Sequence, residues 1–202
     1  MAYFAALLAR YADEWQARDV DLDEVDDGVG LVEFIREACE DEEPDTALVL
    51  LEREDAWFAV VRLDLDEDPR VFASDLAAVG RSGYADLLTA SSLVPVAADG
   101  TPLEIVPAGE DEEASEDDGE DEDGADILDA ELGEEPDVEL DEEEYSGPST
   151  PSGPAGDAGL LADFGQSAKA LVSLCDGRFS PADALAEIAD RLGAAEELEA
   201  VR

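Results

Sequence analysis

Two stretches of alternating acidic residues carry the oxygen ligands that a calcium-binding loop needs. In residues 64–75, aspartates stand at positions 1, 3, 5 and 12 of such a loop. An EF-hand loop needs glycine at position 6 and prefers a bidentate glutamate at position 12, but Pro69 stands at position 6 here. Residues 19–30 begin with the same alternation and end on Gly30 at position 12. We interpret both stretches as solvated acidic turns and predict no metal ligand in either.

The residue types that catalysis most often uses are missing or uninformative. The chain contains no histidine, which excludes Ser-His-Asp and Cys-His mechanisms and every His-ligated metal site. Gly28-Val29-Gly30 lacks the third glycine and the preceding strand of a dinucleotide-binding motif. The 57 acidic residues supply so many carboxylate pairs that no pair indicates acid–base catalysis. We therefore predict that the protein is not an enzyme, with no catalytic residue, no cofactor-binding residue and no cofactor. An enzyme that depends on one specific carboxylate is the alternative.

The cysteines and the large aromatic residues have structural interpretations. Cys39 and Cys175 lie 136 residues apart without a CxxC pair, so we expect two reduced, mostly buried thiols. Trp15, Trp57 and Phe58 are candidate binding residues, but we expect them to pack in the core. Because Trp57 and Phe58 alternate on one predicted strand, we expect one to be buried and the other half exposed.

Charge divides the chain into three segments. The net charge is −17 for residues 1–97, −25 for residues 98–157 and −4 for residues 158–202, which gives −46 for the whole chain. The middle segment contains no Lys or Arg. A polyanion of this kind repels phosphate backbones, which proteins bind through Lys and Arg. We therefore predict no direct nucleic-acid binding.

The segments differ in the folding that they predict. The fold class that we expect is α+β: a small antiparallel-sheet domain with two helices (residues 1–97), a long acidic disordered linker (98–157) and a small helical C-terminal bundle (158–202). The middle segment has too little apolar surface to offset about 1–2 kcal/mol of backbone entropy per residue. Residues 125–132 within it are either a transient helix that folds on a partner or, as we prefer, a less acidic patch.

Hydrophobic patterns and capping residues predict individual elements in the outer segments. For residues 1–97 these are strands at 2–9, 14–20, 46–52, 57–63 and 70–73, a helix capped by Asp21 or Asp23 with Val25, Val29, Val32 and Ile35 on its apolar face, and a second helix capped by Asp75. For residues 158–202 they are a short turn at 160–164, a helix capped by Ser167, a helix that Ser180-Pro181 begins and Gly193 ends, and a final turn or two at 195–201.

The sequence also indicates where the protein works. The apolar stretch at the N-terminus ends at Ala9 and lacks a cationic region before it, so it does not resemble a signal peptide or a membrane span. We predict a cytoplasmic protein with no membrane association. Ten of its eleven basic residues are Arg, which is typical of a high-GC bacterial genome.

Several longer motifs point to one family. In the N-terminal half they are Met1-Ala2-Tyr3-Phe4-Ala5-Ala6, Glu54-Asp55-Ala56-Trp57-Phe58-Ala59-Val60-Val61-Arg62, Glu67-Asp68-Pro69-Arg70-Val71-Phe72 and Ser74-Asp75. In the C-terminal part they are Gly156-Asp157, Leu160-Leu161-Ala162-Asp163-Phe164-Gly165, Pro181-Ala182-Asp183-Ala184-Leu185 and Leu198-Glu199-Ala200-Val201-Arg202. The chain resembles the actinobacterial tRNA adenosine deaminase-associated proteins, which are encoded beside a tRNA adenosine deaminase. The resemblance implies an association by gene neighbourhood. It does not assign a function to any residue of this chain.

Two functional hypotheses follow. A zinc deaminase needs His and Cys ligands, so this chain is not itself the deaminase. The first hypothesis is a non-catalytic accessory protein that binds or regulates a tRNA adenosine deaminase, with the acidic segment competing with tRNA for a basic surface. The alternative is a general two-module interaction or regulatory protein with an acidic spacer and no link to tRNA modification.

Overall fold

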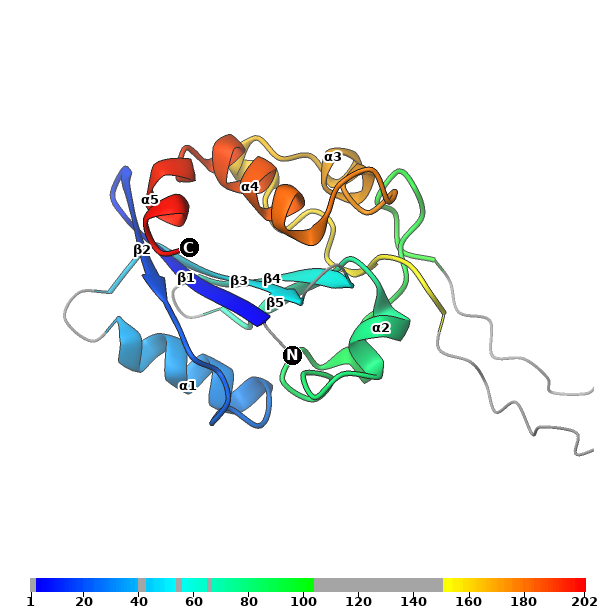
Figure 1. Ribbon diagram of the computed structural model, residues 1–202, viewed down its shortest axis with the longest axis horizontal. Helices are drawn as coiled ribbons and strands as arrows, with labels where there is room; N and C mark the ends of the chain where they lie inside the picture. The colour runs from blue at the N-terminus through cyan, green and yellow to red at the C-terminus, as the bar shows by residue number, and fades with distance from the viewer. Residues whose placement is uncertain (1–2, 40–42, 54–55, 65–66, 104–150) are drawn as a thin grey trace, which may run out of the picture. The chain divides into compact units, whose positions relative to one another are not determined.

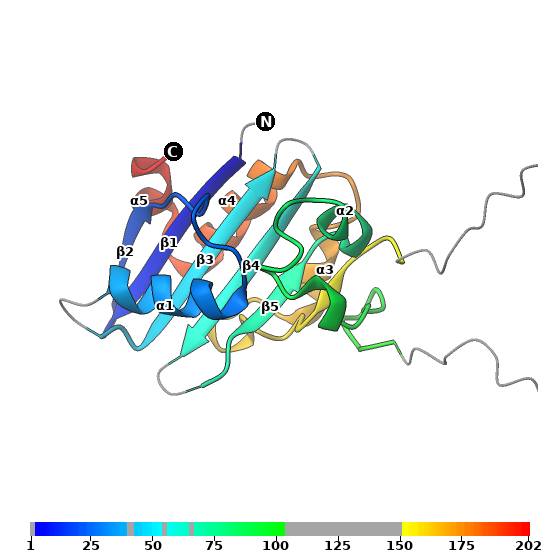
Figure 2. The same cartoon turned by 90° about the horizontal axis from the view of Figure 1, so that it is seen from below.

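A six-stranded antiparallel sheet with helices on both faces forms the described part of the chain. The computed structural model describes residues 3–39, 43–53, 56–64, 67–103 and 151–202, which fall in one compact unit. The strand order is β2-β1-β3-β4-β5-β6. The helices α1 and α2 lie on one face, and α3, α4 and α5 cover the other (Figure 1, Figure 2). The fold class is α+β, as predicted.

The strands are β1 (Tyr3–Tyr11), β2 (Glu14–Asp19), β3 (Thr46–Arg53), β4 (Trp57–Asp64), β5 (Arg70–Ala73) and β6 (Ala155–Gly156). The helices are α1 (Gly28–Ala38), α2 (Leu76–Gly80), α3 (Ala168–Ser173), α4 (Pro181–Leu192) and α5 (Ala195–Ala200), with short 3-10 turns at η1 (Ala90–Ser92) and η2 (Ala162–Phe164).

Alternating residues of the sheet build two separate cores. The paired residues Leu7, Val49 and Val61 belong to the core beneath α1 and α2. The adjacent row, in which Leu50 pairs with Val60, belongs to the core beneath α4 and α5. Because helices cover both faces, β3 and β4 are apolar on both sides, as the continuous apolar run at residues 46–52 predicts.

The same arrangement corrects one expectation about the aromatic residues. Trp57 and Phe58 point to opposite faces of β4, but each is only 2% exposed. Trp57 packs against Tyr84 in one core and Phe58 against Phe72 in the other. The expectation that one of them is half exposed is wrong, because a hydrophobic core covers each face of β4.

Helix α1 differs from its predicted form. Its N-cap is Asp27, whose side chain accepts a hydrogen bond from the Gly30 amide, and not Asp21 or Asp23. Its buried residues are Leu31 and Ile35, whereas Val29, predicted on the apolar face, is 69% exposed. The prediction fails in the first turn, because the glycines on either side of Val29 leave that turn without a clear apolar pattern.

The C-terminal helices pack on the sheet formed by the N-terminal residues. Helix α4 contacts β3 and β4, and α5 contacts β2. Ser180 caps α4 through the Asp183 amide, and Gly193 ends it with φ 74°, both as predicted. Two further caps are confirmed, since Asp75 and Ser167 accept hydrogen bonds from amides in the first turns of α2 and α3.

A short sixth strand was not predicted. Ala155 and Gly156, at the end of the segment predicted as a linker, pair with Ala73 and Phe72 of β5. Two residues carry too little pattern to indicate a strand. Residues 104–150 lie outside the described residues, and with them residues 125–132, for which a transient helix was the alternative to a less acidic patch. No helix among the described residues is long and apolar enough to cross a membrane.

Candidate functional site

The acidic segment of residues 104–150 is flanked on both sides by residues that are fixed at one edge of the sheet. The residues before it and after it meet next to β5, where Pro95 forms a β-bridge with Ala155 and the Val96 amide donates to the Pro154 carbonyl at 3.0 Å. The Gly156 amide donates to the Val94 carbonyl at 2.8 Å. Residues 104–150 are therefore inserted between two neighbouring points of a single folded unit. They contain 23 acidic residues and no Lys or Arg.

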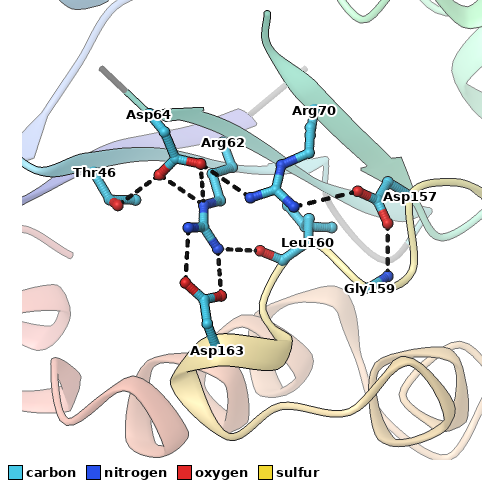
Figure 3. A network of polar contacts seen from close by, with 8 residues as sticks. All are labelled: Thr46, Arg62, Asp64, Arg70, Asp157, Gly159, Leu160 and Asp163. Carbon is cyan, nitrogen blue, oxygen red and sulfur yellow. Dashed lines mark hydrogen bonds and ion pairs between the residues drawn. The ribbon is translucent and has the colours of Figure 1, made fainter. Parts of the chain in front are cut away.

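A buried arginine fixes the chain that follows the acidic segment (Figure 3). Arg62 of β4 is only 6% exposed. Its Nη2 donates to Asp163 Oδ2 at 2.8 Å, and its Nη1 donates to the other oxygen of Asp163 and to the Leu160 carbonyl. The ring of Phe164 lies 4.8 Å from the guanidinium carbon. The turn η2 is thus held on the sheet by charge, hydrogen bonds and an aromatic contact.

A second arginine extends this network along the sheet. Asp64 Oδ2 accepts from Arg62 Nε at 2.8 Å and from Arg70 Nη2 at 3.0 Å, while Asp64 Oδ1 accepts from the Thr46 hydroxyl at 2.6 Å. Arg70 also pairs with Asp157 at 3.6 Å. Asp157 in turn accepts from the Gly159 amide. The network therefore joins β3, β4 and β5 to residues 157–163.

The charges of the network stabilise one another. Burial alone raises the pKa of Asp64, but hydrogen bonds from Thr46, Arg62 and Arg70 outweigh it and lower that pKa below its usual value. The hydrogen bond from Arg62 lowers the pKa of Asp163 despite partial burial. Burial lowers the pKa of Arg62, but the bonds to the two aspartates more than reverse this and raise it. All three groups are charged near pH 7, which is typical of a structural ion network.

The carboxylates of the two calcium-loop stretches have separate structural contacts. In residues 64–75, Asp64 belongs to the arginine network, Asp75 caps α2 and Asp68 is exposed. In residues 19–30, Asp21 accepts hydrogen bonds from the Tyr3 hydroxyl at 2.7 Å and from the Asp23 amide. Within the described part of the chain, no three His, Cys, Asp or Glu side chains gather in a way that could hold a metal ion.

The cysteines and Trp15 also have structural surroundings. Both cysteines are free thiols. Burial raises the pKa of Cys39, and burial together with the nearby charges of Asp176 and Asp75 raises the pKa of Cys175 to about 12. Low-pKa thiolates are the reactive ones, so neither cysteine has the properties of a nucleophile. The indole of Trp15 donates to the Leu192 carbonyl at 3.0 Å and joins β2 to the end of α4.

Comparison with protein-family models finds a similarity over residues 110–195 of the chain. Residues 110–195 match the family described as Rv3753c-like tRNA adenosine deaminase-associated protein. The match confirms the predicted resemblance for residues 110–195, which include most of the acidic segment, β6, α3, α4 and the first residue of α5. The name indicates association with a tRNA adenosine deaminase. No curated protein and no solved structure matches the chain.

Proposed function

We propose that the protein is a non-catalytic, cytoplasmic accessory protein that binds a tRNA adenosine deaminase, the enzyme for which the family of residues 110–195 is named. One observation carries the proposal: 23 acidic residues without a compensating base are inserted into a folded unit that fastens both ends of the insertion. In this proposal the insertion is a polyanion whose flanking residues are fixed at a defined place on the folded unit.

The insertion has the electrostatic properties of a competitor for tRNA. An enzyme that binds tRNA needs a basic surface, because most of the affinity for nucleic acid comes from phosphate contacts. A dense row of carboxylates is attracted to the same surface and steered to it over long distances. We infer that the insertion occupies part of the tRNA-binding face of the deaminase and thereby regulates access of tRNA.

Many basic residues of the folded unit already have carboxylate partners in the same chain. Six of the ten arginines form ion pairs with carboxylates of the same chain: Arg10, Arg62, Arg70, Arg178, Arg191 and Arg202. The rest of the chain remains strongly acidic. These pairings support binding to a protein and not to the nucleic acid.

A competition experiment tests the proposal. Purified deaminase from the same organism is loaded with fluorescently labelled tRNA, and the full chain is added at about 50 mM and about 300 mM salt. We expect the wild type to displace tRNA at low salt and to lose most of this effect at high salt, since screening weakens exposed charges. A variant with every Asp and Glu of residues 104–150 changed to Asn or Gln should bind weakly and displace no tRNA.

A matched control separates charge from sequence. A variant in which residues 104–150 are scrambled keeps length and charge and should displace tRNA like the wild type. Binding to the deaminase that survives neutralisation would show that the insertion is only a spacer and would contradict its role as a competitor for tRNA. Absence of any binding between the wild type and the deaminase would contradict the proposal itself.

A further inference from the structure

An open groove of about 940 Å³ lies on the face of the sheet opposite to the C-terminal helices. Its walls come from α1, from the turn before β5 and from residues 86–92 after α2. Besides Asp27, which caps α1, five carboxylates line it, and all five are exposed. They are Asp26 and Glu33 on the α1 side, Glu67 and Asp68 on the turn, and Asp86 opposite.

These carboxylates contrast with those of the arginine network on the other face. Within the described residues, none of the five forms an ion pair, whereas Asp64, Asp157 and Asp163 are all paired with arginines. Arg36 is the one base among the described residues that line the groove. A concave surface with unpaired charges of one sign concentrates its field within the cavity. The groove is therefore a strongly negative hollow and not a neutralised ion network.

The groove also exposes apolar surface. Val29, on the first turn of α1, lines it with 69% of its surface accessible, the highest value among the large apolar residues of the described chain. The half-buried Val32 and the exposed Pro69 line it as well. An apolar patch inside a charged rim is the usual composition of a protein-binding surface.

We propose that this groove docks a basic segment of the partner protein, with Lys or Arg side chains against the carboxylates and an apolar side chain against Val29. The inference rests on the proposed function, so the segment belongs to the deaminase. Charge complementarity selects this occupant: nucleic acid, anionic membranes, a second copy of this chain and residues 104–150 are all repelled by the groove. The residues that line the groove lie outside residues 110–195, so the family match does not contribute to the description of the groove itself.

Binding measurements with the full chain and the purified deaminase test the groove. A Glu33→Lys, Asp68→Lys variant reverses one charge on each of two walls, and we expect its affinity to fall about tenfold at low salt. Val29→Ser should lower the affinity about threefold at low and at high salt, because an apolar contact is not screened. Asp190→Lys, Glu199→Lys is the matched control on α4 and α5, and its affinity should stay within about twofold of the wild type.

Each outcome supports or overturns the inference. The affected side chains are exposed, and an unchanged circular dichroism melt identifies variants that fold normally. An equal loss of affinity in the groove variant and in the control would assign the effect to the charge of the whole chain and overturn the groove. Normal affinity of the groove variant would overturn the groove but leave the proposed function intact. A wild type that does not bind the deaminase would overturn both.

Discussion

Arg62 and Asp163 form a two-pronged ion pair although 101 positions separate them in the chain. Arg62 comes from the centre of the sheet, and Asp163 comes from the turn that follows the acidic insertion. The pair therefore joins the two sides of the insertion through side chains, as the bridge between Pro95 and Ala155 does through the backbone.

Removal of Asp163 should destabilise the fold. Asp163→Ala leaves the buried Arg62 with Asp64 and the Leu160 carbonyl as partners, so we expect a loss of about 1–2 kcal/mol in the free energy of unfolding. Urea titration followed by tryptophan fluorescence measures the loss. Asp190→Ala removes an exposed carboxylate from α4 and should change stability by less than about 0.5 kcal/mol. Equal stability of both variants would show that the ion pair contributes nothing.

The contribution of this pair should depend on pH. Because folding lowers the pKa of Asp163, the pair stabilises the protein above the ordinary aspartate pKa of about 3.9, and this stabilisation is lost as the pH falls through the lowered value. The many other carboxylates also titrate, so the useful quantity is the difference in unfolding free energy between the wild type and Asp163→Asn. This difference should be constant from about pH 7 to pH 5 and shrink below about pH 4. A difference that does not shrink at all as the pH falls below about 4 would contradict the assignment.

Gly156 should be sensitive to the smallest substitution. Its φ is 97°, and a Cβ atom there would overlap the Val71 carbonyl oxygen. Gly156→Ala should therefore lower the free energy of unfolding by about 2–4 kcal/mol. Gly153→Ala is a close control, since Gly153 has φ 107° but open space where the added methyl group would lie. In Gly153→Ala only the positive φ of the backbone causes strain. Similar losses of unfolding free energy in both variants would therefore show that the close approach to Val71 does not matter.

The two cysteines should react slowly in the native protein. With the pKa of Cys175 raised to about 12, only about one molecule in ten thousand carries this thiolate at about pH 8. A disulfide reagent at that pH should modify neither Cys175 nor the buried Cys39 at the rate of a free thiol, and both should react fully once urea has unfolded the chain. Rapid reaction of one thiol in the native state would show that its surroundings open readily.

Local patterns predicted some elements closely. Helix α4 begins at Ser180-Pro181 and ends at Gly193 as expected, because capping residues and an apolar stripe act within a few residues of one another. The strands β3, β4 and β5 follow from apolar runs between acidic turns in the same way. The candidate groove was not predicted, since its walls come from three elements and its exposed Val29 was expected to be buried.

The sequence by itself determined the charge of the protein, the absence of histidine chemistry, the positions of most helices and strands, and the family resemblance. These properties are local or additive, so they can be read one segment at a time. The tertiary structure decided which helices cover each face of the sheet, that β6 completes it after the acidic insertion, and that Arg62 is buried beside Asp163. Such contacts join residues about a hundred positions apart, and they form only when packing and hydrogen bonding outweigh the entropy of closing the chain between them.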